Sequence, residues 1–230
     1  MCQVSPWRGE KMNLAELNEK YDEMQLIYGD PGLRSIFYGG CTENPDICFV
    51  FMNPTGKNIA SCPDWTGMRA PWIGTKNIWD LFVAIGKFDE EIYREIKNRK
   101  PKDWTPEFAD RVYSEITQNR IFLTNLGKCT QTDAAMIPNR IYSEYSALLE
   151  REIEIIAPKA VVLFGNQVST VFLKQNISVS QCRRKQFDKE IGGKVFRCFP
   201  VFYPVGNGRA NISKSIEDIK WIYENILLHV

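Results

Sequence analysis

Four residues suited to binding a small polar group, or to permitting a tight turn, stand where four apolar segments of the chain end. They are Asn53, Asn125, Gly165 and Tyr203. A side-chain amide offers an acceptor and two donors but is no real base, and a phenol can donate a hydrogen bond. Such residues can position a water molecule or read the polar edge of a ligand.

Composition excludes several common kinds of active site. The only histidine is His229, so we expect no Ser-His-Asp triad, no histidine acid and no zinc hydrolase built on histidines. Seven cysteines, an odd number with no Cys-x-x-Cys spacing, are typical of reduced thiols in an intracellular protein. A scattered zinc or iron–sulfur site remains an alternative. The formal net charge of +1 gives no overall field that would attract nucleic acid.

The spacing of apolar residues predicts strands that alternate with helices. A continuous apolar run indicates a buried strand at residues 46–52, and further strands are indicated at residues 120–124, 160–164 and 194–202. Helical spacing indicates helices at residues 13–28, 76–85, 105–116, 140–156, 165–174 and 213–228. Ser213 is the expected N-cap of the last helix.

This alternation predicts an α/β fold: three layers, α/β/α, around a central, mostly parallel, four-stranded sheet. The length of 230 residues fits a single domain, residues 1–230, with a helical lead-in at residues 13–45. The charged and polar residues 87–106 are an insertion, or an exposed helix plus loop. Ligands of such folds bind beyond the carboxyl ends of the strands. We therefore expect the site where Asn53, Asn125, Gly165 and Tyr203 meet.

Several segments in register resemble the motifs of one known family. They are Met52–Gly56, Pro71–Gly74, Thr124–Cys129, Pro158–Gly165 and Tyr203–Arg209. From about Asp46 to its end, the chain is similar to the uracil-DNA glycosylase superfamily. The first segment resembles the Asn-Pro turn of the mismatch-specific and single-strand-selective branches. The other segments resemble the thermophile-type branch, including its Thr-Asn-x-x-Lys-Cys strand end.

The sequence also departs from the family pattern. Phe51 and Thr55 replace glycines of the first motif, and Tyr203 replaces the histidine of the last. Only Cys129 matches one of the four cysteines that hold an iron–sulfur cluster in the thermophile-type branch. We therefore expect no cluster, no other cofactor and no metal.

The resemblance implies hydrolysis of the bond between a deaminated base, above all uracil, and its sugar, leaving an abasic site. The base would be flipped into a pocket. Asn53 would position the water, Asn125 would read N3–H and O4 of uracil, and Trp72 would stack on the base. Tyr203 would donate to O2 of the departing base. The expected substrate pocket also contains Met52, Pro54 and Gly165.

Each of these residues also has a plainer interpretation. Asn53 can be a turn residue, Asn125 a cap, Trp72 a core residue and Tyr203 a packing residue. Asp64 is an alternative activator of water.

A loop and a basic run are candidates for contact with DNA. Gly206, Asn207, Gly208 and Arg209 are expected to form a loop that enters the duplex, since glycines permit close backbone approach. Arg183-Arg184-Lys185 would bind phosphates, or would be a solvated hairpin.

Two other functions remain open: a family member that binds nucleic acid without catalysis, and an unrelated nucleotide-binding α/β enzyme. The chain has no Gly-x-Gly-x-x-Gly or Walker sequence to favour the latter.

Apolar runs are too short for a membrane span and there is no signal-peptide core. The expected protein is an intracellular, cytoplasmic monomer, in the nucleoid if prokaryotic, whose partner is DNA with a damaged or deaminated base.

Overall fold

A computed structural model describes residues 12–134 and 137–228, and it contains one sheet of six strands in the order β1-β3-β2-β4-β6-β5. The strands are β1 (Tyr38–Gly40), β2 (Ile47–Phe51), β3 (Ile121–Asn125), β4 (Ala160–Phe164), β5 (Phe187–Ile191) and β6 (Lys194–Val201). Neighbours among the middle four, β3, β2, β4 and β6, pair in parallel, and each edge strand pairs antiparallel.

The expected count of four strands is wrong, because both antiparallel edge strands lack a continuous apolar run. β1 has only three residues, two of which are Gly39 and Gly40. β5 alternates partly buried and exposed positions, with Asp188, Lys189 and Glu190 at its centre. Polar alternation of this kind is usual for an edge strand with one face in water. Of the four predicted strands, β2, β3 and β4 are buried on both faces throughout, and β6 is so in its second half.

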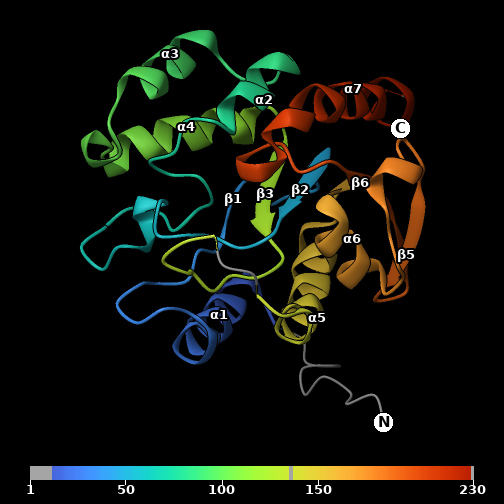
Figure 1. The fold of residues 1–230 in the computed structure, drawn as a ribbon, viewed down its shortest axis with the longest axis horizontal. Coiled ribbons are helices and arrows are strands. Elements are labelled where there is room, and N and C mark those ends of the chain that lie inside the picture. The colour runs from blue at the N-terminus through green and yellow to red at the C-terminus, as the bar shows by residue number, and fades with distance from the viewer. Residues whose placement is uncertain (1–11, 135–136, 229–230) are drawn as a thin grey trace.

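Helices cover both faces of the sheet, so the three-layer α/β/α architecture is confirmed (Figure 1). One layer contains α1 (Leu14–Tyr28), α5 (Asn139–Ile156) and α6 (Gly165–Leu173). The other contains α2 (Trp79–Ala84), α3 (Glu90–Asn98), α4 (Pro106–Gln118) and α7 (Ile212–Ile222).

The two layers enclose separate hydrophobic cores because successive strand residues point to opposite faces. In β2, Phe49 and Phe51 face the core under α2 and α4, whereas Cys48 and Val50 face the core under α1 and α5. All four side chains are fully buried. This alternation explains why β2 reads in the sequence as an unbroken apolar run.

Local signals fix most helix starts. Asn13 caps α1 by accepting from the backbone N–H groups of Ala15 and Glu16, and Glu16 accepts from the Asn13 N–H in return. Thr105 caps α4 in a similar way. The cap predicted at Ser213 is wrong: α7 begins at Ile212, and its flanking residue Asn211 makes no side-chain capping bond.

Residues 87–106 contain α3 and a short 3₁₀ turn, Pro101–Asp103. This segment is polar on average, but Ile96 is fully buried and Trp104 nearly so. Residues 13–45 contain β1 as well as α1. No helix among the described residues combines the length and the apolar character that crossing a membrane requires.

Candidate active site

The carboxyl ends of the four parallel strands lie next to one another along one edge of the sheet. Phe51, the last residue of β2, pairs with Asn125, the last residue of β3. Phe164, the last residue of β4, pairs with Val201, the last residue of β6. The segments that begin after these strands, including Asn53, Gly165 and Tyr203, therefore start from the same edge.

The loop after β2 is held against the chain that follows β3. The Leu126 N–H donates to the Phe51 carbonyl and the Gly127 N–H to the Met52 carbonyl, each at 2.8 Å. Further along, Thr55 and Gln131 form a parallel bridge. This pairing extends the sheet beyond its formal strand ends and fixes the backbone that presents Asn53 and buried Pro54.

Both ends of the partly buried Asn53 amide are engaged. Its Nδ2 donates to the Pro54 carbonyl at 3.1 Å, and its Oδ1 accepts from the hydroxyl of Tyr142 at 2.6 Å. An amide oxygen has two lone pairs, so Oδ1 can accept one further hydrogen bond. The geometry therefore leaves Asn53 an oriented acceptor, as positioning a water requires.

Asn125 carries an unused donor. The residue is 2% exposed, and its Nδ2 is buried without a hydrogen-bond partner. Leaving a buried donor unpaired costs about 1–3 kcal/mol, so such a group calls for an explanation. A ligand that offers an acceptor at this strand end would supply one.

A fully buried ion pair lies behind Asn125. Lys128 Nζ is 3.1 Å from Glu152 Oε1 on α5, and both side chains are 0% exposed. Lys128 also donates to the Asn125 carbonyl at 2.9 Å and to the Thr124 hydroxyl. Burial lowers the pKa of Lys128, while the Glu152 carboxylate opposes that shift. The sequence offered no signal for this pair, because Glu152 lies within the apolar face of a long helix.

Glu152 accepts two more hydrogen bonds, from the hydroxyls of Thr124 at 2.5 Å and Tyr21 at 3.1 Å. The cluster thus joins α1, β3 and α5 directly behind the β3 end. It holds the backbone of Asn125 rather than its side chain.

Aromatic rings surround the end of β2. The Phe51 ring stacks on Phe164 with centroids 4.7 Å apart, and Trp72 and Tyr203 meet Phe51 edge-on at 4.9 and 6.4 Å. Of the four, Trp72 and Tyr203 are only partly buried. A planar base would find aromatic surface here, although the contacts also suit packing.

Trp72 has two unusual features. Its φ of +71° lies in the left-handed region, where a bulky residue other than glycine has a strained backbone conformation. Its indole Nε1 is buried and has no hydrogen-bond partner. The Thr75 N–H and hydroxyl both donate to the Trp72 carbonyl, at 3.1 and 2.8 Å, and so stabilise the turn.

Tyr203 lies against the start of α6. A Cβ added to Gly165, whose φ is +88°, would be 3.6 Å from Tyr203 Cβ. Burial raises the pKa of the Tyr203 hydroxyl well above its ordinary value, and a hydrogen bond with the Met52 backbone opposes the shift. The phenol therefore stays protonated and can donate a hydrogen bond.

The loop after Tyr203 forms a 3₁₀ turn over Gly206–Asn211. Gly206 has a φ of +57°, and a Cβ at Gly208 would fall 2.0 Å from the Tyr203 carbonyl oxygen, so neither glycine is incidental. Arg209 is half-exposed and forms an ion pair with Asp80, with Nη2 2.5 Å from Oδ2. The candidate DNA loop is thus fixed to the start of α2.

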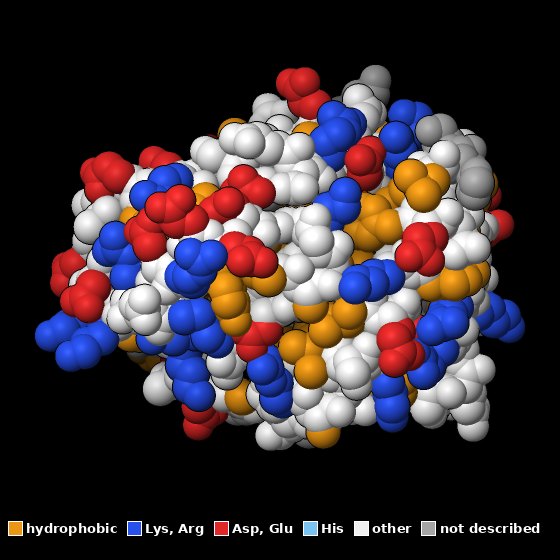
Figure 2. Space-filling model, turned by 90° about the horizontal axis from the view of Figure 1, so that it is seen from above, with side chains coloured by type: hydrophobic (Ala, Val, Ile, Leu, Met, Phe, Trp, Pro, Cys, Tyr) orange, Lys and Arg blue, Asp and Glu red, His pale blue; other side chains and the backbone are white. Residues whose placement is uncertain are grey.

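The two arginines of the basic run are already paired within the protein. Arg183 donates to both carboxylate oxygens of buried Asp218 and to Glu217, and Arg184 also contacts Asp218. Figure 2 shows basic and acidic side chains intermixed on the side of the molecule where α2, α3 and α7 lie. The visible face therefore carries no continuous basic field.

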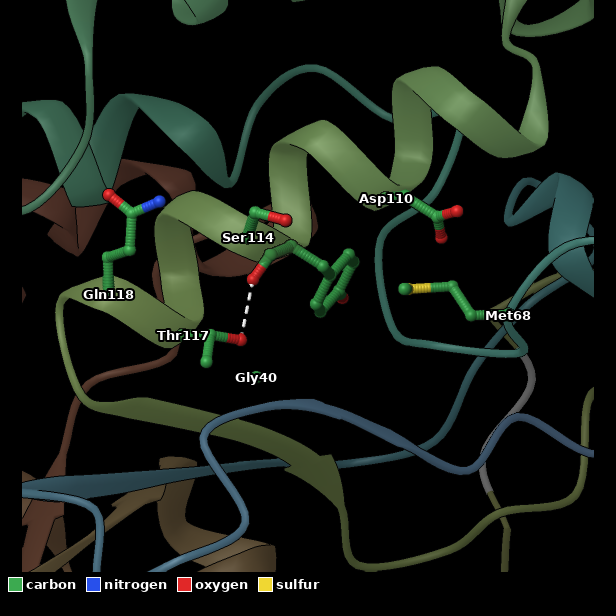
Figure 3. A pocket seen from close by; sticks show the side chains of 7 residues that line it. Gly40, Met68, Asp110, Ser114, Thr117 and Gln118 are labelled. Atoms are coloured by element: carbon green, nitrogen blue, oxygen red, sulfur yellow. Dashed lines mark hydrogen bonds between the residues drawn. The ribbon is translucent and has the colours of Figure 1, made fainter.

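Two open hollows lie away from the strand-end residues. The first, of about 460 Å³, is lined by α4 residues including Asp110 and Thr117, together with Gly40 and Met68 (Figure 3). Gly40 pairs with Phe122 near the amino end of β3. A second hollow of similar size lies between α1 and Arg34. Neither includes Asn53, Asn125 or Tyr203.

The other site candidates from the sequence are not among the residues that directly follow the four parallel strands. Asp64 is an exposed loop residue. Within residues 12–134 and 137–228, no group of three or more His, Cys, Asp or Glu side chains is placed to hold a metal ion. His229 lies outside the described residues.

The chain was compared with models of protein families. Residues 38–225 match the model described as the uracil DNA glycosylase superfamily. This match spans well over half of the chain. It runs from β1 to beyond the end of α7 and so includes all four parallel strands and the loops at their carboxyl ends.

Proposed function

Because the chain belongs to the uracil-DNA glycosylase superfamily, we propose that it is a DNA glycosylase that removes uracil from DNA and leaves an abasic site. Members of this family act on DNA and are generally glycosylases. The choice of uracil, and of the residues below, is our proposal. It also follows that the unrelated nucleotide-binding enzyme considered from the sequence is no longer a candidate.

The observation that carries the proposal is the unpartnered, buried Nδ2 of Asn125 at the end of β3. Uracil presents an acceptor at O4 beside the N3–H donor. An amide supplies the complementary donor and acceptor side by side. Cytosine presents the opposite pattern at these positions and would face donor against donor. With Nδ2 directed at O4 and Oδ1 at N3–H, the Asn125 amide would accept uracil and reject cytosine.

Asn53 would position the attacking water through the second lone pair of Oδ1. Because an amide is no real base, the bond between C1′ and the base must break largely before water attacks. The departing uracil takes the bonding electrons. The water oxygen then bonds to the oxocarbenium-like C1′ and its proton passes to solvent or to the released base.

Tyr203 and Trp72 would complete the pocket, with Met52, Pro54 and Gly165 forming its backbone wall. The protonated Tyr203 hydroxyl would donate to O2 of uracil as negative charge builds there. Partly buried Trp72 would stack on the base, an interaction worth about 1–3 kcal/mol. The Gly206–Arg209 loop would contact the duplex from which the base is flipped.

The test is base release from single- and double-stranded oligonucleotides that contain one uracil, read as strand cleavage after alkali. We expect cleavage with the wild type, and a single-turnover rate about a hundredfold lower for Asn53→Ala, as for loss of a group that acts in the transition state. Asn98→Ala is the matched control, because Asn98 is exposed at the end of α3.

Two results would contradict the proposal. Wild-type cleavage no greater than that of enzyme-free DNA on every uracil substrate would exclude the reaction, and cleavage by Asn53→Ala at the wild-type rate would exclude the role proposed for Asn53. DNA binding without any base release would instead identify a family member that has kept binding and lost catalysis.

A further inference from the structure

Tyr142 on α5 reaches the residue to which we assign the water. Its side chain is fully buried, and its hydroxyl lies 2.6 Å from Asn53 Oδ1. We propose that Tyr142 is a positioning residue that fixes the amide plane of Asn53 and so aims its free lone pair at the attacking water. This inference rests on the proposed function, and it concerns a residue that no motif in the sequence marks.

The direction of the hydrogen bond follows from the chemistry of the two groups. An amide oxygen can only accept, so the Tyr142 hydroxyl donates. A hydroxyl can donate to Oδ1 or accept from Nδ2, so the Tyr142 hydroxyl alone would not fix which end of the Asn53 amide faces it. The Pro54 carbonyl makes that choice, because it accepts from Nδ2 at 3.1 Å and would repel Oδ1. Tyr142 and Pro54 together therefore hold a single orientation.

Loss of either contact would weaken that orientation. With the Tyr142 hydroxyl removed, only the Pro54 carbonyl would restrain rotation of the Asn53 side chain. A rotated amide would present its NH₂ group to the water. The water would then direct its own oxygen at Asn53 instead of at C1′. Catalysis depends on such geometry, because misplacing a reactive group by about 1 Å can cost about a hundredfold in rate.

Gly127 makes the contact between Tyr142 and Asn53 possible. Its N–H donates to the Met52 carbonyl at 2.8 Å, which brings its backbone beside the Asn53 loop. A Cβ at Gly127 would lie 2.9 Å from Tyr142 Cε1 and 3.6 Å from Asn53 Cβ. The missing side chain thus leaves room for the tyrosine ring between α5 and the loop. An alanine at this position would push the ring away from Asn53.

Tyr142 cannot itself be the base that activates water. Burial raises the pKa of its hydroxyl far above the ordinary value, and negative charge on Cys129 or Tyr203 would raise it further. The group stays a neutral phenol at any pH at which the protein would work. Its contribution is therefore a fixed donor to Asn53.

The same helix supplies a matched control. Tyr145 lies three residues further along α5 and is also fully buried. Its ring packs on Tyr21 and Tyr28, with centroids 6.3 and 6.5 Å away, and not on the Asn53 loop. Tyr145→Phe therefore removes a buried hydroxyl from the same helix without touching Asn53.

The experiment is a double-mutant cycle on the single-turnover rate of uracil release. We expect Tyr142→Phe to lower the rate about tenfold, as for one lost hydrogen bond that acts through the transition state, with the dissociation constant for uracil-containing DNA unchanged. Gly127→Ala should lower the rate in the same direction. In an Asn53→Ala background, Tyr142→Phe should have no further effect. Tyr145→Phe should release base at the wild-type rate, and thermal unfolding should show all variants folded.

The outcomes separate this inference from the proposed function. If the wild type releases uracil but Tyr142→Phe matches Tyr145→Phe, the inference is wrong and the function stands. Effects of Tyr142→Phe and Asn53→Ala that multiply independently would also overturn it, because they would show a merely structural role. If the wild type releases no base from any uracil substrate, both the function and the inference are overturned.

Discussion

Tyr203 and a histidine at the same place would differ in the range of pH over which each donates a hydrogen bond. An imidazole changes charge near pH 6.5, whereas an ordinary phenol keeps its proton up to about pH 10. Burial disfavours the phenolate, so the pKa of Tyr203 is higher still. The donor proposed for O2 of uracil is therefore present throughout the neutral and mildly alkaline range.

We accordingly expect uracil release to lose no rate from deprotonation of Tyr203 between about pH 7 and pH 10. Tyr203→Phe should lower the rate about tenfold by an equal factor at each pH, because it removes one hydrogen bond to the departing base. Single-turnover rates across this range, for wild type and variant, check the prediction. A wild-type rate that falls with rising pH, and a variant rate that does not, would contradict it.

At the scale of single residues, Asn53 and Asn125 could be selected from the sequence because they follow apolar runs. Tyr142 could not. It belongs to the helical spacing of the inward face of α5, where a tyrosine is indistinguishable from a core residue. Only the fold brings α5 across the loop after β2, 89 positions earlier in the chain, and turns a packing residue into a hydrogen-bond donor.

An ion pair between Arg209 and Asp80 joins the loop Gly206–Asn211 to the start of α2. Asp80 is largely buried and accepts from Arg209, Lys97 and Tyr93. Burial opposes ionisation, but these hydrogen bonds outweigh it and hold the pKa of Asp80 below its ordinary value. A single carboxylate therefore pairs with two cations beside the loop that we expect to meet DNA.

Replacing Asp80 by Asn should free both cations for phosphate. Each phosphate contact steepens the dependence of log affinity on log salt by about 0.9, so we expect Asp80→Asn to bind DNA without uracil more tightly at low salt, with a slope steeper by up to about 2. Arg209→Gln should change both in the opposite direction. Fluorescence anisotropy of labelled DNA at several salt concentrations measures this.

Asp110→Asn is the matched control, because Asp110 is an exposed residue of α4 in the hollow of Figure 3 and its loss changes net charge equally. If both variants tighten binding to the same extent, net charge alone is responsible. That result would remove the loop and Asp80 from the account of DNA binding.

Among the strands, sequence patterns predict the four parallel strands in the middle of the sheet and miss the two strands at its edges. The parallel strands and their helices follow from apolar runs and helical spacing. β5 escapes detection because its central residues are charged, and β1 because Gly39 and Gly40 provide no side chains to form a pattern. Both edge strands depend on pairing with a neighbour, and strand pairing is a property of the assembled sheet.

A buried ion pair links one helix layer of the molecule to the sheet. Lys128 at the β3 end and Glu152 on α5 are both 0% exposed, and Tyr21 joins them from α1. Other buried polar side chains of this layer, such as Gln25, Ser146 and Ser169, are uncharged. A buried pair gains little over an apolar pair, but breaking it by removing one partner leaves an uncompensated charge in the interior.

This asymmetry gives the last prediction, which concerns the free energy of unfolding. Lys128→Met should destabilise the protein by about 3–5 kcal/mol, because Glu152 is left buried without a cation. Adding Glu152→Leu should recover part of that loss, since the double variant buries no unpaired charge. Recovery should be incomplete, because the hydroxyls of Thr124 and Tyr21 lose their acceptor. Urea unfolding of the single and double variants measures the coupling energy between Lys128 and Glu152. Arg94→Ala is the control: Arg94 forms an exposed ion pair with Glu90, so its loss should change the free energy of unfolding by no more than about 0.5 kcal/mol. Strictly additive losses in the double variant would show that Lys128 and Glu152 do not stabilise the fold as a pair.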